Sequence, residues 1–335
     1  MRQKMTAYMN LDISYKFKTV IVAGATGYIG QYVCKTLVSR GHRVITIGRS
    51  TPPAQDALIY RNINVEVCSR ADIEVIKGSI PRIDVVISCL GSRSGGRQDS
   101  WLVELDANKN LLSLAQSGHA EQFVLLSAIC VQKPRLEFQF AKLAFEEVLV
   151  ASGMPFTIVR PTAYFKSLAG QIENVKAGKP FCVFDNGTRT ACKPISGRDL
   201  ALFMCDCIEL PEKLNKILPI GGPGPSVSLK EQGEMIFRLI DKPCRIRQIP
   251  SGAFSVIGTL MAPLGFFSQR LSDKQEFLRI AHYYATESML FWDRDAKRYS
   301  AEKTPEYGSD TLESFYKQVI NSGLKGHELG EQKFF

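Results

Sequence analysis

The chain is poor in the residues that bind metals and form disulfide frameworks. Its 335 residues include only four histidines, none spaced as a pair of ligands, and nine cysteines, an odd number with no C-x-x-C pair. These counts argue against a zinc enzyme, an iron–sulfur protein and a secreted domain held by disulfides. They indicate buried thiols in a reducing cytoplasm, and no resident metal is expected.

Basic residues outnumber acidic ones but form no continuous run. Lys and Arg number 42 against 33 Asp and Glu, which gives a net charge of +9. No run of five or more basic residues occurs, so the charge does not predict a nucleic-acid partner. We interpret the excess as a source of solubility and of attraction for an anionic ligand.

Long apolar segments are also missing. Residues 1–18 carry charged side chains and no apolar core of a signal peptide, which predicts a cytoplasmic protein. The longest uncharged stretch, between Arg247 and Arg270, is interrupted by Gly, Pro and Ser, so it does not predict a membrane-spanning helix. It is more typical of a pocket wall, or of a lid over residues 251–269 that associates weakly with a membrane surface.

Short apolar strands alternate with amphipathic helices up to about residue 222. The strands are almost continuously apolar, as expected when helices cover both faces of a parallel sheet. The predicted fold is therefore α/β, a doubly wound parallel sheet of the Rossmann type with a smaller substrate lobe. Residues 14–165 and 192–222 would form the cofactor-binding core, and residues 166–191 and 223–335 the lobe. The predicted strands are 19–23, 44–48, 64–68, 85–90, 123–127 and 156–160, and the predicted helices are 28–40, 101–118 and 136–152, with a capping box at Asp310 and Glu313 for a closing helix.

A glycine-rich turn joins the first predicted strand to the first predicted helix. It reads Gly24-Ala25-Thr26-Gly27-Tyr28-Ile29-Gly30. Glycines at this spacing allow a tight turn and a close approach of the backbone, so that a pyrophosphate can rest on the helix N-terminus. The turn therefore predicts a dinucleotide cofactor bound by these residues. The alternative is a structural turn without a ligand.

The end of the second strand indicates which dinucleotide is bound. A site for NAD would place Asp or Glu here to bond the ribose hydroxyls. This chain has Arg49 and Ser50 instead, with Arg43 nearby, and no carboxylate between Ile45 and Pro53. A guanidinium favours a 2′-phosphate, so the predicted cofactor is NADPH. The alternative is that Arg49 is a solvated loop residue.

The glycine spacing and the strand order resemble the extended and atypical short-chain dehydrogenase/reductase superfamily. Its members follow the fifth strand with a Ser and place Tyr-x-x-x-Lys on the next helix. Here Ser127 and Lys142 are kept, but Phe138 stands at the tyrosine position. The literal match from Tyr299 to Lys303 lies in a polar segment far from that helix, and we interpret it as chance. The usual proton donor is missing, which argues against alcohol oxidation and leaves double-bond reduction or no catalysis open.

The segment after the third predicted strand departs from the superfamily pattern. Related proteins often place an Asp there to bond the adenine amino group, whereas this chain reads Val67-Cys68-Ser69-Arg70. We expect Ser69 to substitute for that Asp, and Asp72 to be a helix N-cap.

Several longer sequence segments are more specific to one protein family than these motifs. They are LLSAICVQKP (125–134), VRPTAYFKSLAGQ (159–171), ACKPIS (191–196), LPIGGPG (218–224), EKTPEYGSDTLESF (302–315) and GHELGEQKFF (326–335). With the glycine loop they resemble the divinyl chlorophyllide a 8-vinyl reductase family, from about residue 18 to the C-terminus. The resemblance implies NADPH-dependent reduction of the C8 vinyl group of divinyl chlorophyllide a, or of its protochlorophyllide precursor, to ethyl in chlorophyll or bacteriochlorophyll biosynthesis. The lack of a plastid transit segment indicates a bacterial, cytoplasmic member.

The resemblance also implies roles for individual residues. Lys142 would bond the nicotinamide ribose and raise the local positive potential, unless it is a solvated helix lysine. Tyr164 and Lys166 follow the sixth predicted strand, and either could supply the proton, unless Tyr164 is only a packed aromatic. The remaining residues assigned to the cofactor are Leu90, Gly91, Ser127, Pro161 and Thr162.

The implied substrate is a large, flat Mg-tetrapyrrole with a carboxylate, so its pocket should be wide, aromatic and basic at one rim. Two other functions stay open, namely an isoflavone-reductase-like NADPH-dependent double-bond reductase and a non-catalytic NADP-sensing or assembly protein of the same fold. The candidate pocket walls are Phe165, Phe181, Phe184, Phe266 and Phe267, and the candidate carboxylate partners are Arg160, Lys166, Arg189 and Lys193.

Overall fold

The central element of the fold is a parallel sheet. A computed structural model describes residues 17–49, 61–77, 79–80, 82–93, 95–252 and 269–323. Its sheet has the strand order β3-β2-β1-β4-β5-β6-β9, with every neighbouring pair parallel. This order confirms the predicted doubly wound fold. The strands are β1 (Thr19–Ala23), β2 (Arg43–Gly48), β3 (Arg61–Asn64), β4 (Val85–Ser88), β5 (Gln122–Leu126), β6 (Phe156–Pro161) and β9 (Lys216–Ile220).

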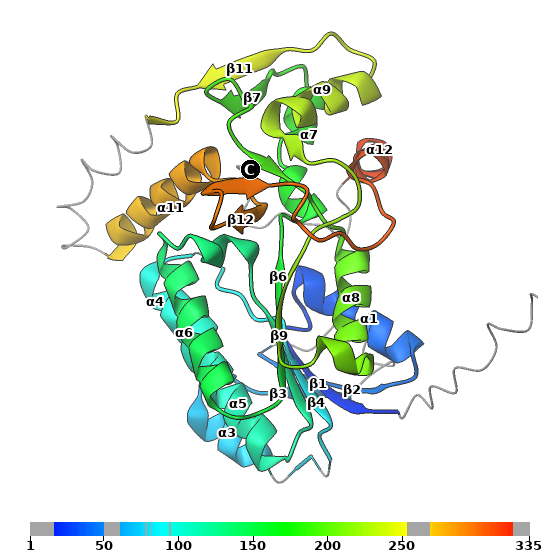
Figure 1. Ribbon diagram of the computed structural model, residues 1–335, viewed down its shortest axis with the longest axis vertical. Coiled ribbons are helices and arrows are strands. Elements are labelled where there is room, and N and C mark those ends of the chain that lie inside the picture. The colour runs from blue at the N-terminus through cyan, green and yellow to red at the C-terminus, as the bar shows by residue number, and fades with distance from the viewer. Residues whose placement is uncertain are drawn as a thin grey trace, which may run out of the picture.

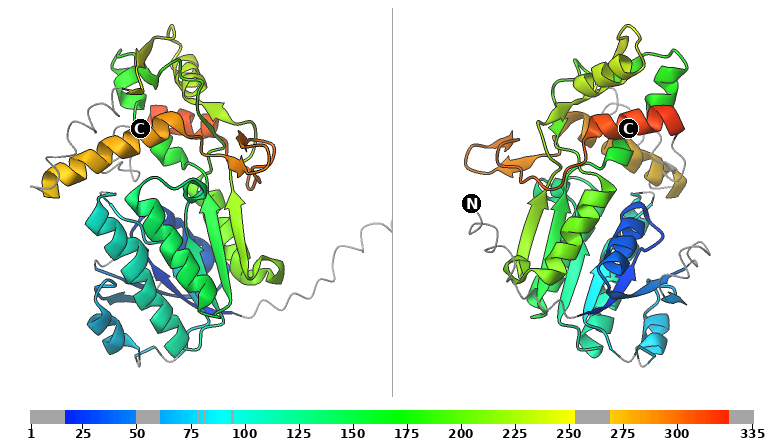
Figure 2. Two further views of the ribbon diagram at one scale, coloured as in Figure 1. Left: turned by 60° about the vertical axis from the view of Figure 1, so that its left-hand side comes forward. Right: turned by 90° about the vertical axis from the view of Figure 1, so that its right-hand side faces the viewer.

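Helices cover both faces of this sheet (Figures 1 and 2). Val20 and Val22 of β1 pack into the hydrophobic cluster of one face, and Ile21 and Ala23 into that of the other. Successive side chains of a strand point to opposite faces, which explains why this strand is apolar at every position. One face carries α1 (Tyr28–Ser39) and α8 (Gly197–Glu209), and the other carries α3 (Arg70–Ile76), α5 (Ala107–Ser117) and α6 (Glu137–Ala151).

The two edge strands differ from the prediction. β3 ends at Asn64, where the predicted strand begins. Val65 and Val67, which belong to the predicted strand, follow the observed one and are buried in the cluster that includes α3 and α5. The prediction misses β9, which contains Pro219. An edge strand accepts proline because its outer backbone groups need no partner in the sheet.

The helix predicted over residues 101–118 consists of two different segments. It begins with a π-helical segment, η1 (Trp101–Asp106), and continues as α5. Short π-helical turns are rare and occur frequently at functional sites. Glu104, which is buried, belongs to this segment. The other short helices of the core are α4 (Arg97–Ser100), η2 (Ile129–Gln132) and η4 (Pro211–Lys213).

A lobe lies above the carboxyl ends of the strands (Figure 1). It has its own hydrophobic core, in which Phe165, Phe181, Ile236 and Tyr316 are buried. The predicted boundaries between core and lobe stay a prediction. The lobe contains η3 (Phe165–Leu168), α7 (Ile172–Lys176), β7 (Phe181–Phe184), β8 (Ala191–Cys192), β10 (Val227–Ser228), α9 (Leu229–Leu239), β11 (Ile246–Ile249), α11 (Gln269–Thr286), β12 (Phe291–Asp293), β13 (Arg298–Ser300) and α12 (Leu312–Ser322).

Two searches of the described part of the chain concern membranes and metals. Within the described ranges no helix combines the length and apolar character needed to cross a membrane. The same ranges contain no group of three or more His, Cys, Asp or Glu side chains arranged to hold a metal ion.

The last helix, α12, begins at a different cap from the predicted one. Thr311 is the N-cap residue, and its hydroxyl accepts a hydrogen bond from the Ser314 backbone N–H at 3.2 Å. Asp310 instead accepts a hydrogen bond from the Ser196 hydroxyl at 2.7 Å. The predicted capping box at Asp310 and Glu313 is therefore wrong, because Asp310 has a long-range partner at the start of α8.

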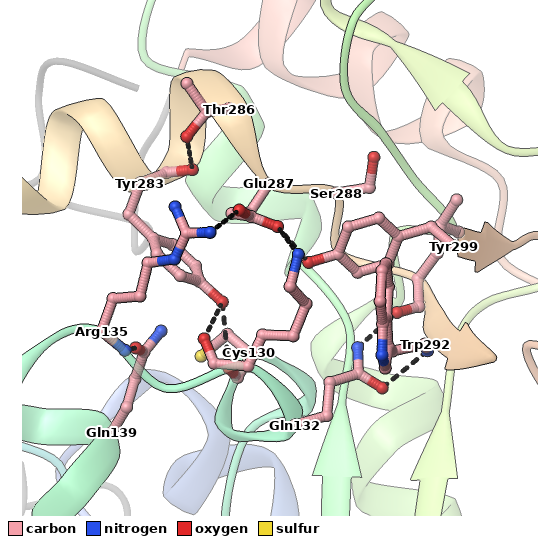
Figure 3. Close-up of polar contacts among 12 residues, drawn as sticks. Cys130, Gln132, Arg135, Gln139, Tyr283, Thr286, Glu287, Ser288, Trp292 and Tyr299 are labelled. Carbon is pink, nitrogen blue, oxygen red and sulfur yellow. Dashed lines mark hydrogen bonds and ion pairs between the residues drawn. The ribbon is translucent and has the colours of Figure 1, made fainter. Parts of the chain in front are cut away.

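A buried carboxylate ties the lobe to the core (Figure 3). Glu287, directly after α11, accepts a hydrogen bond from Lys133 Nζ at 2.7 Å and pairs with Arg135 at 2.9 Å. Tyr299 of β13 donates to the same carboxylate at 2.6 Å. Burial by itself raises the pKa of Glu287, but the bonds from Lys133 and Tyr299 and the charge of Arg135 outweigh it, so the pKa is lowered. The carboxylate therefore favours its ionised form in the folded protein.

We expect Glu287→Gln to lower the free energy of unfolding at neutral pH by about 1–3 kcal/mol, because charge-assisted hydrogen bonds are lost. The folded-state pKa is lowered, so the stabilisation is present above the usual carboxyl value of 4.5 and disappears as the pH falls through the folded-state value. Denaturant titrations at neutral and at acidic pH measure this difference. As a control, Glu173→Gln removes an exposed pair with Lys176 and should cost less than about 1 kcal/mol. An equal loss for Glu287→Gln at both pH values would contradict the role of its charge.

Candidate functional site

The glycine loop folds as the tight turn that its sequence predicts. Gly24 has a positive φ of 77°, and its carbonyl accepts a hydrogen bond from the Gly27 backbone N–H at 2.9 Å. A Cβ atom at Gly24 would lie 2.5 Å from the Cys89 carbonyl oxygen, and one at Gly30 would overlap the Gly24 carbonyl. The start of α1 lies so close to the ends of β1 and β4 that larger residues are excluded at both positions.

The N-terminus of α1 is suited to an anion. Gly27 is the N-cap residue and has no side chain to bond the first N–H groups, and no acidic residue lies in the first turn. The positive end of the helix dipole is therefore not compensated there. The Tyr28 ring packs beside Gly197 of α8 and makes an edge contact with Tyr32. The geometry fits the pyrophosphate of a dinucleotide.

Arg49 lies where β2 ends, and its side chain is 64% exposed. Its Nε lies 3.9 Å from the Glu66 carboxylate. The sequence does not predict this contact, because Arg49 follows β2 and Glu66 follows β3, and the two ends come together only in the folded sheet. The expectation that Arg43 lies near Arg49 is wrong, since Arg43 begins β2 and lies at the opposite end of the strand. Ser50 lies outside the described residues.

Ser69, the expected substitute for an adenine-binding Asp, is the N-cap residue of α3. Its hydroxyl accepts a hydrogen bond from the Asp72 backbone N–H at 3.2 Å. Asp72 is not the N-cap, as the sequence predicted; it lies inside the helix, and its carboxylate accepts from the Glu66 backbone N–H at 3.2 Å. Capping of the N-terminus of α3 is by itself enough to explain why a serine stands at position 69.

Lys142 forms a buried ion pair with Glu104. The Lys142 Nζ lies 2.7 Å from Oε2 of Glu104, and the two side chains are 11% and 3% exposed. The other carboxylate oxygen accepts a hydrogen bond from the Ser92 backbone N–H at 2.9 Å, next to Gly91. Lys142 is therefore not a solvated helix lysine. The predicted rise in positive potential is also wrong, because Glu104 neutralises the charge.

Ser127 is held in the protein interior as well. Its hydroxyl donates to Oε1 of Glu146 at 2.5 Å, and the Arg160 guanidinium pairs with the same carboxylate. Arg160, a predicted partner for the substrate carboxylate, is therefore already paired. Lys142 and Glu146 lie one turn apart, so α6 contributes a cation and an anion to two buried ion pairs.

Tyr164 follows β6 and lies beside the glycine loop. Its ring centroid is 6.2 Å from that of Tyr28. Burial raises the pKa of Tyr164 well above its usual range, and the nearby Cys89, Cys130 and Glu104 add to the rise. Tyr164 is thus both a packed aromatic and a phenol that keeps its proton at neutral pH.

Lys166 and Thr162, which flank Tyr164 in the sequence, have different surroundings. The Lys166 ammonium lies 5.1 Å from the centroid of the Tyr28 ring, in a cation–π contact. The Thr162 hydroxyl donates to the Lys193 carbonyl, so it joins β6 to the segment after β8. Thr162 is buried, and its side chain has a structural partner.

Taken together, the described chain places most predicted site residues at the carboxyl ends of the strands. Sequence reasoning missed Glu104, which no motif marks. The predicted residues found at this edge are Gly24, Ala25, Thr26, Gly27, Tyr28, Ile29, Gly30, Arg49, Leu90, Gly91, Ser127, Lys142, Pro161, Thr162, Tyr164 and Lys166.

The residues predicted for the substrate pocket agree with the structure less well than those predicted for the cofactor site. Phe165 and Phe181 are buried in the lobe core, so their assignment as pocket walls is wrong. Lys193 and Arg189, the two remaining basic candidates, are each paired with a carboxylate. Phe184 is half-buried at the end of β7. Outside the described residues lie residues 253–268, which include Phe266, Phe267 and most of the predicted lid.

The literal Tyr-x-x-x-Lys match consists of two structural residues. The Tyr299 hydroxyl donates to Glu287 at 2.6 Å (Figure 3), and Lys303 Nζ donates to Asp293 at 2.6 Å. The Tyr299 ring also makes an edge contact with Trp292, with 4.9 Å between the centroids. The two side chains bond different carboxylates of the lobe, in agreement with their interpretation as a chance match.

Comparison with known proteins identifies the family. A family model described as NAD(P)H-binding matches residues 24–211. Divinyl chlorophyllide a 8-vinyl-reductase of Cucumis sativus is 48% identical over 337 residues, which cover 96% of this chain and 80% of the relative. The protein of the same name from Zea mays is 45% identical over 95% of this chain and 83% of the relative. This chain belongs to the divinyl chlorophyllide a 8-vinyl-reductase family.

Membership of the vinyl-reductase family confirms the predicted reductase and its nicotinamide cofactor. The fold is shared more widely. The solved structure of an NADPH-dependent quinone oxidoreductase from Escherichia coli, complexed with NADPH, has a TM-score of 0.65 at 14% identity. The similarity covers 90% of this chain and 100% of that one. At this identity it supports the fold alone.

The predicted cytoplasmic location is wrong by the same comparison. Four vinyl reductases that are 44–48% identical to this chain are named as chloroplastic proteins. The prediction depended on the cysteine usage and on the composition of residues 1–18, and neither determines location.

Glu104→Gln should lower the free energy of unfolding by about 3–5 kcal/mol, because it leaves the Lys142 ammonium buried without its counter-charge. Adding Lys142→Met removes that charge, so the double variant should be more stable than Glu104→Gln alone. Urea denaturation of the three proteins measures this. Glu234→Gln, which loses an exposed pair with Lys230, is the matched control and should cost less than about 1 kcal/mol. A double variant that is less stable than the single variant would contradict the energetic coupling.

Proposed function

We propose that this chain uses NADPH to reduce the C8 vinyl group of divinyl chlorophyllide a, or of divinyl protochlorophyllide, to ethyl in chlorophyll or bacteriochlorophyll biosynthesis. The observation that carries this proposal is the identity of 48% to a vinyl reductase over nearly the whole chain. The site agrees with it. Phe138 stands where the superfamily places the tyrosine used on alcohols, whereas Lys142 and the glycine loop are kept.

In this proposal the cofactor lies across the carboxyl ends of the strands. The glycine loop, residues 24–30, holds the pyrophosphate. Arg49 receives the 2′-phosphate, for which it would leave its weak contact with Glu66. When bound, NADPH supplies the hydride. The remaining cofactor contacts are assigned to Leu90, Gly91, Ser127, Pro161 and Thr162.

Lys142 orients the cofactor and adds no net charge. An ammonium has three N–H donors, so the bond to Glu104 leaves donors for the hydroxyls of the nicotinamide ribose. Glu104 fixes where those donors lie, because its second oxygen is held by the Ser92 backbone N–H. We therefore assign Lys142 to cofactor binding and Glu104 to positioning Lys142.

The reacting group is a vinyl conjugated to a macrocycle. Its outer carbon accepts hydride, because the negative charge that develops spreads into the ring. Its inner carbon must then receive a proton. Tyr164 and Lys166 both lie against the ring of Tyr28 at the start of α1. We propose that these two residues border the substrate where it meets the cofactor.

The proposal is tested by incubating the full chain with NADPH and divinyl chlorophyllide a. Loss of the conjugated vinyl should shift the Soret band to the blue and yield the monovinyl product on chromatography. An unchanged Soret band with NADPH still bound would overturn the proposal and favour a non-catalytic NADP-binding assembly protein. Reduction of small phenolic substrates in place of the tetrapyrrole would favour an isoflavone-reductase-like enzyme.

Arg49→Ala should raise the Kd for NADPH by roughly 10- to 100-fold, because charge-assisted bonds to the 2′-phosphate are worth about 1.5–3 kcal/mol. The Kd for NADH, which lacks that phosphate, should change little. Arg43→Ala is the matched control, since Arg43 is exposed at the far end of the same strand, and it should leave both constants unchanged. Quenching of protein fluorescence measures the four values. An equal weakening of NADPH and NADH by Arg49→Ala would show that Arg49 is structural.

A further inference from the structure

The phenol that the superfamily places on α6 is replaced here by Phe138. The ring of Phe138 is partly buried against a hydrophobic cluster that includes Cys130 and Leu136, from the segment leading into α6. Tyr283 and Tyr284 of α11 pack in the same cluster. A tyrosine therefore reaches the surroundings of position 138 from a distant part of the chain.

Two contacts fix the turn of α11 that carries Tyr284. The preceding residue, Tyr283, donates to the carbonyl oxygens of Cys130 at 3.0 Å and Lys133 at 3.2 Å. Glu287, three residues after Tyr284, accepts a hydrogen bond from Lys133 Nζ. Both contacts are made to the segment before α6. The position of Tyr284 is therefore set relative to α6 and its Lys142, across the boundary between lobe and core.

Tyr284 packs in a cluster that extends to the neighbours of two site residues. Its ring meets that of Tyr283 edge-on, with 5.7 Å between the centroids. Ala128 and Ala163, the sequence neighbours of Ser127 and Tyr164, pack against the same cluster as Tyr284. Burial raises the pKa of Tyr284 well above its usual range. The phenol therefore carries its proton at neutral pH and can act as a donor.

Tyr284 packs in the hydrophobic cluster that includes Leu136 and Phe138, at the start of α6. Phe138 and Lys142 are one turn apart on this helix, and Tyr284 packs with the cluster that contains Phe138. Tyr284 and a side chain at position 138 therefore share one hydrophobic cluster. Tyr164 comes from the end of β6 instead and packs on Tyr28.

We propose that Tyr284 is the acid that protonates the inner vinyl carbon, in place of the phenol missing from position 138. The proposal rests on the reductase function proposed above. The hydride brings the electron pair of the new C–H bond at the outer carbon, and the π pair of the C=C bond moves to the inner carbon and the ring. The inner carbon then takes the proton as the phenol O–H bond breaks. A proton from water restores the phenol, so atoms and charge balance.

Tyr284→Phe tests this proposal, because it removes the hydroxyl and keeps the ring. The expected result is a fall in kcat of about 10²- to 10⁴-fold, the usual contribution of a general acid. The Kd for NADPH and the thermal unfolding midpoint should not change. Water must then supply the proton, so the solvent deuterium isotope effect on kcat should exceed that of the wild-type protein.

Two further variants separate this role from other effects. Tyr316→Phe removes a buried phenol that donates to the Leu168 carbonyl at 3.0 Å inside the lobe core, so it should reduce stability and leave kcat unchanged. Tyr164→Phe should lower kcat less than Tyr284→Phe does. The proposal is overturned if Tyr284→Phe retains the wild-type kcat, or if Tyr164→Phe alone causes the large loss. A wild-type protein that binds NADPH but leaves the vinyl group intact would overturn the reductase function, and this proposal with it.

Discussion

The buried ion pair between Lys142 and Glu104 is the contact on which the arrangement of the site depends. A buried charge without its partner costs several kcal/mol, so η1 and α6 must meet in one register. Trp101 of η1 adds to this by donating to Glu137, the first residue of α6, at 2.9 Å. The segments that follow β4 and β5 are thereby held together.

The lobe is attached to the core through α6 and the segment before it. The backbone N–H of Glu137 donates to Glu276 of α11 at 3.1 Å, and Arg279 donates to the Arg135 carbonyl at 2.7 Å. Glu287 adds the third tie, to Lys133. Every one of these contacts reaches α6 or the segment just before it. The ion pair that places α6 therefore also places α11 and the tyrosines that it carries.

This arrangement suits a reaction whose charge is spread over a macrocycle. A carbonyl that receives hydride develops a localised oxyanion, which an unbalanced cation stabilises well. Hydride addition to a conjugated vinyl group develops charge that the ring itself delocalises. The Lys142–Glu104 ion pair has no net charge, so it can orient the cofactor without providing a fixed positive charge. The protonated phenols nearby can donate the proton.

The parts of the fold that were predictable are those specified by local sequence. β1, the glycine turn and α1 follow from a β-branched run, glycines that tolerate a positive φ, and one apolar helical face. The edge strands were harder, because β3 is polar and β9 contains Pro219. The side chains that complete the site come from long-range pairing: 38 residues separate Glu104 from Lys142 and 154 separate Lys133 from Glu287. No spacing rule connects such positions, so the paired state of Lys142 was missed.

The central claim is that the nicotinamide cofactor supplies one hydrogen to the vinyl group and an exchangeable protein group supplies the other. Isotope labelling of the ethyl product tests this most directly. With NADPH deuterated at C4 in ordinary water, mass spectrometry and NMR should find one deuterium, on the outer carbon. With ordinary NADPH in heavy water, they should find one deuterium on the inner carbon. An ethyl group that takes both new hydrogens from water, with none from the cofactor, would contradict the account.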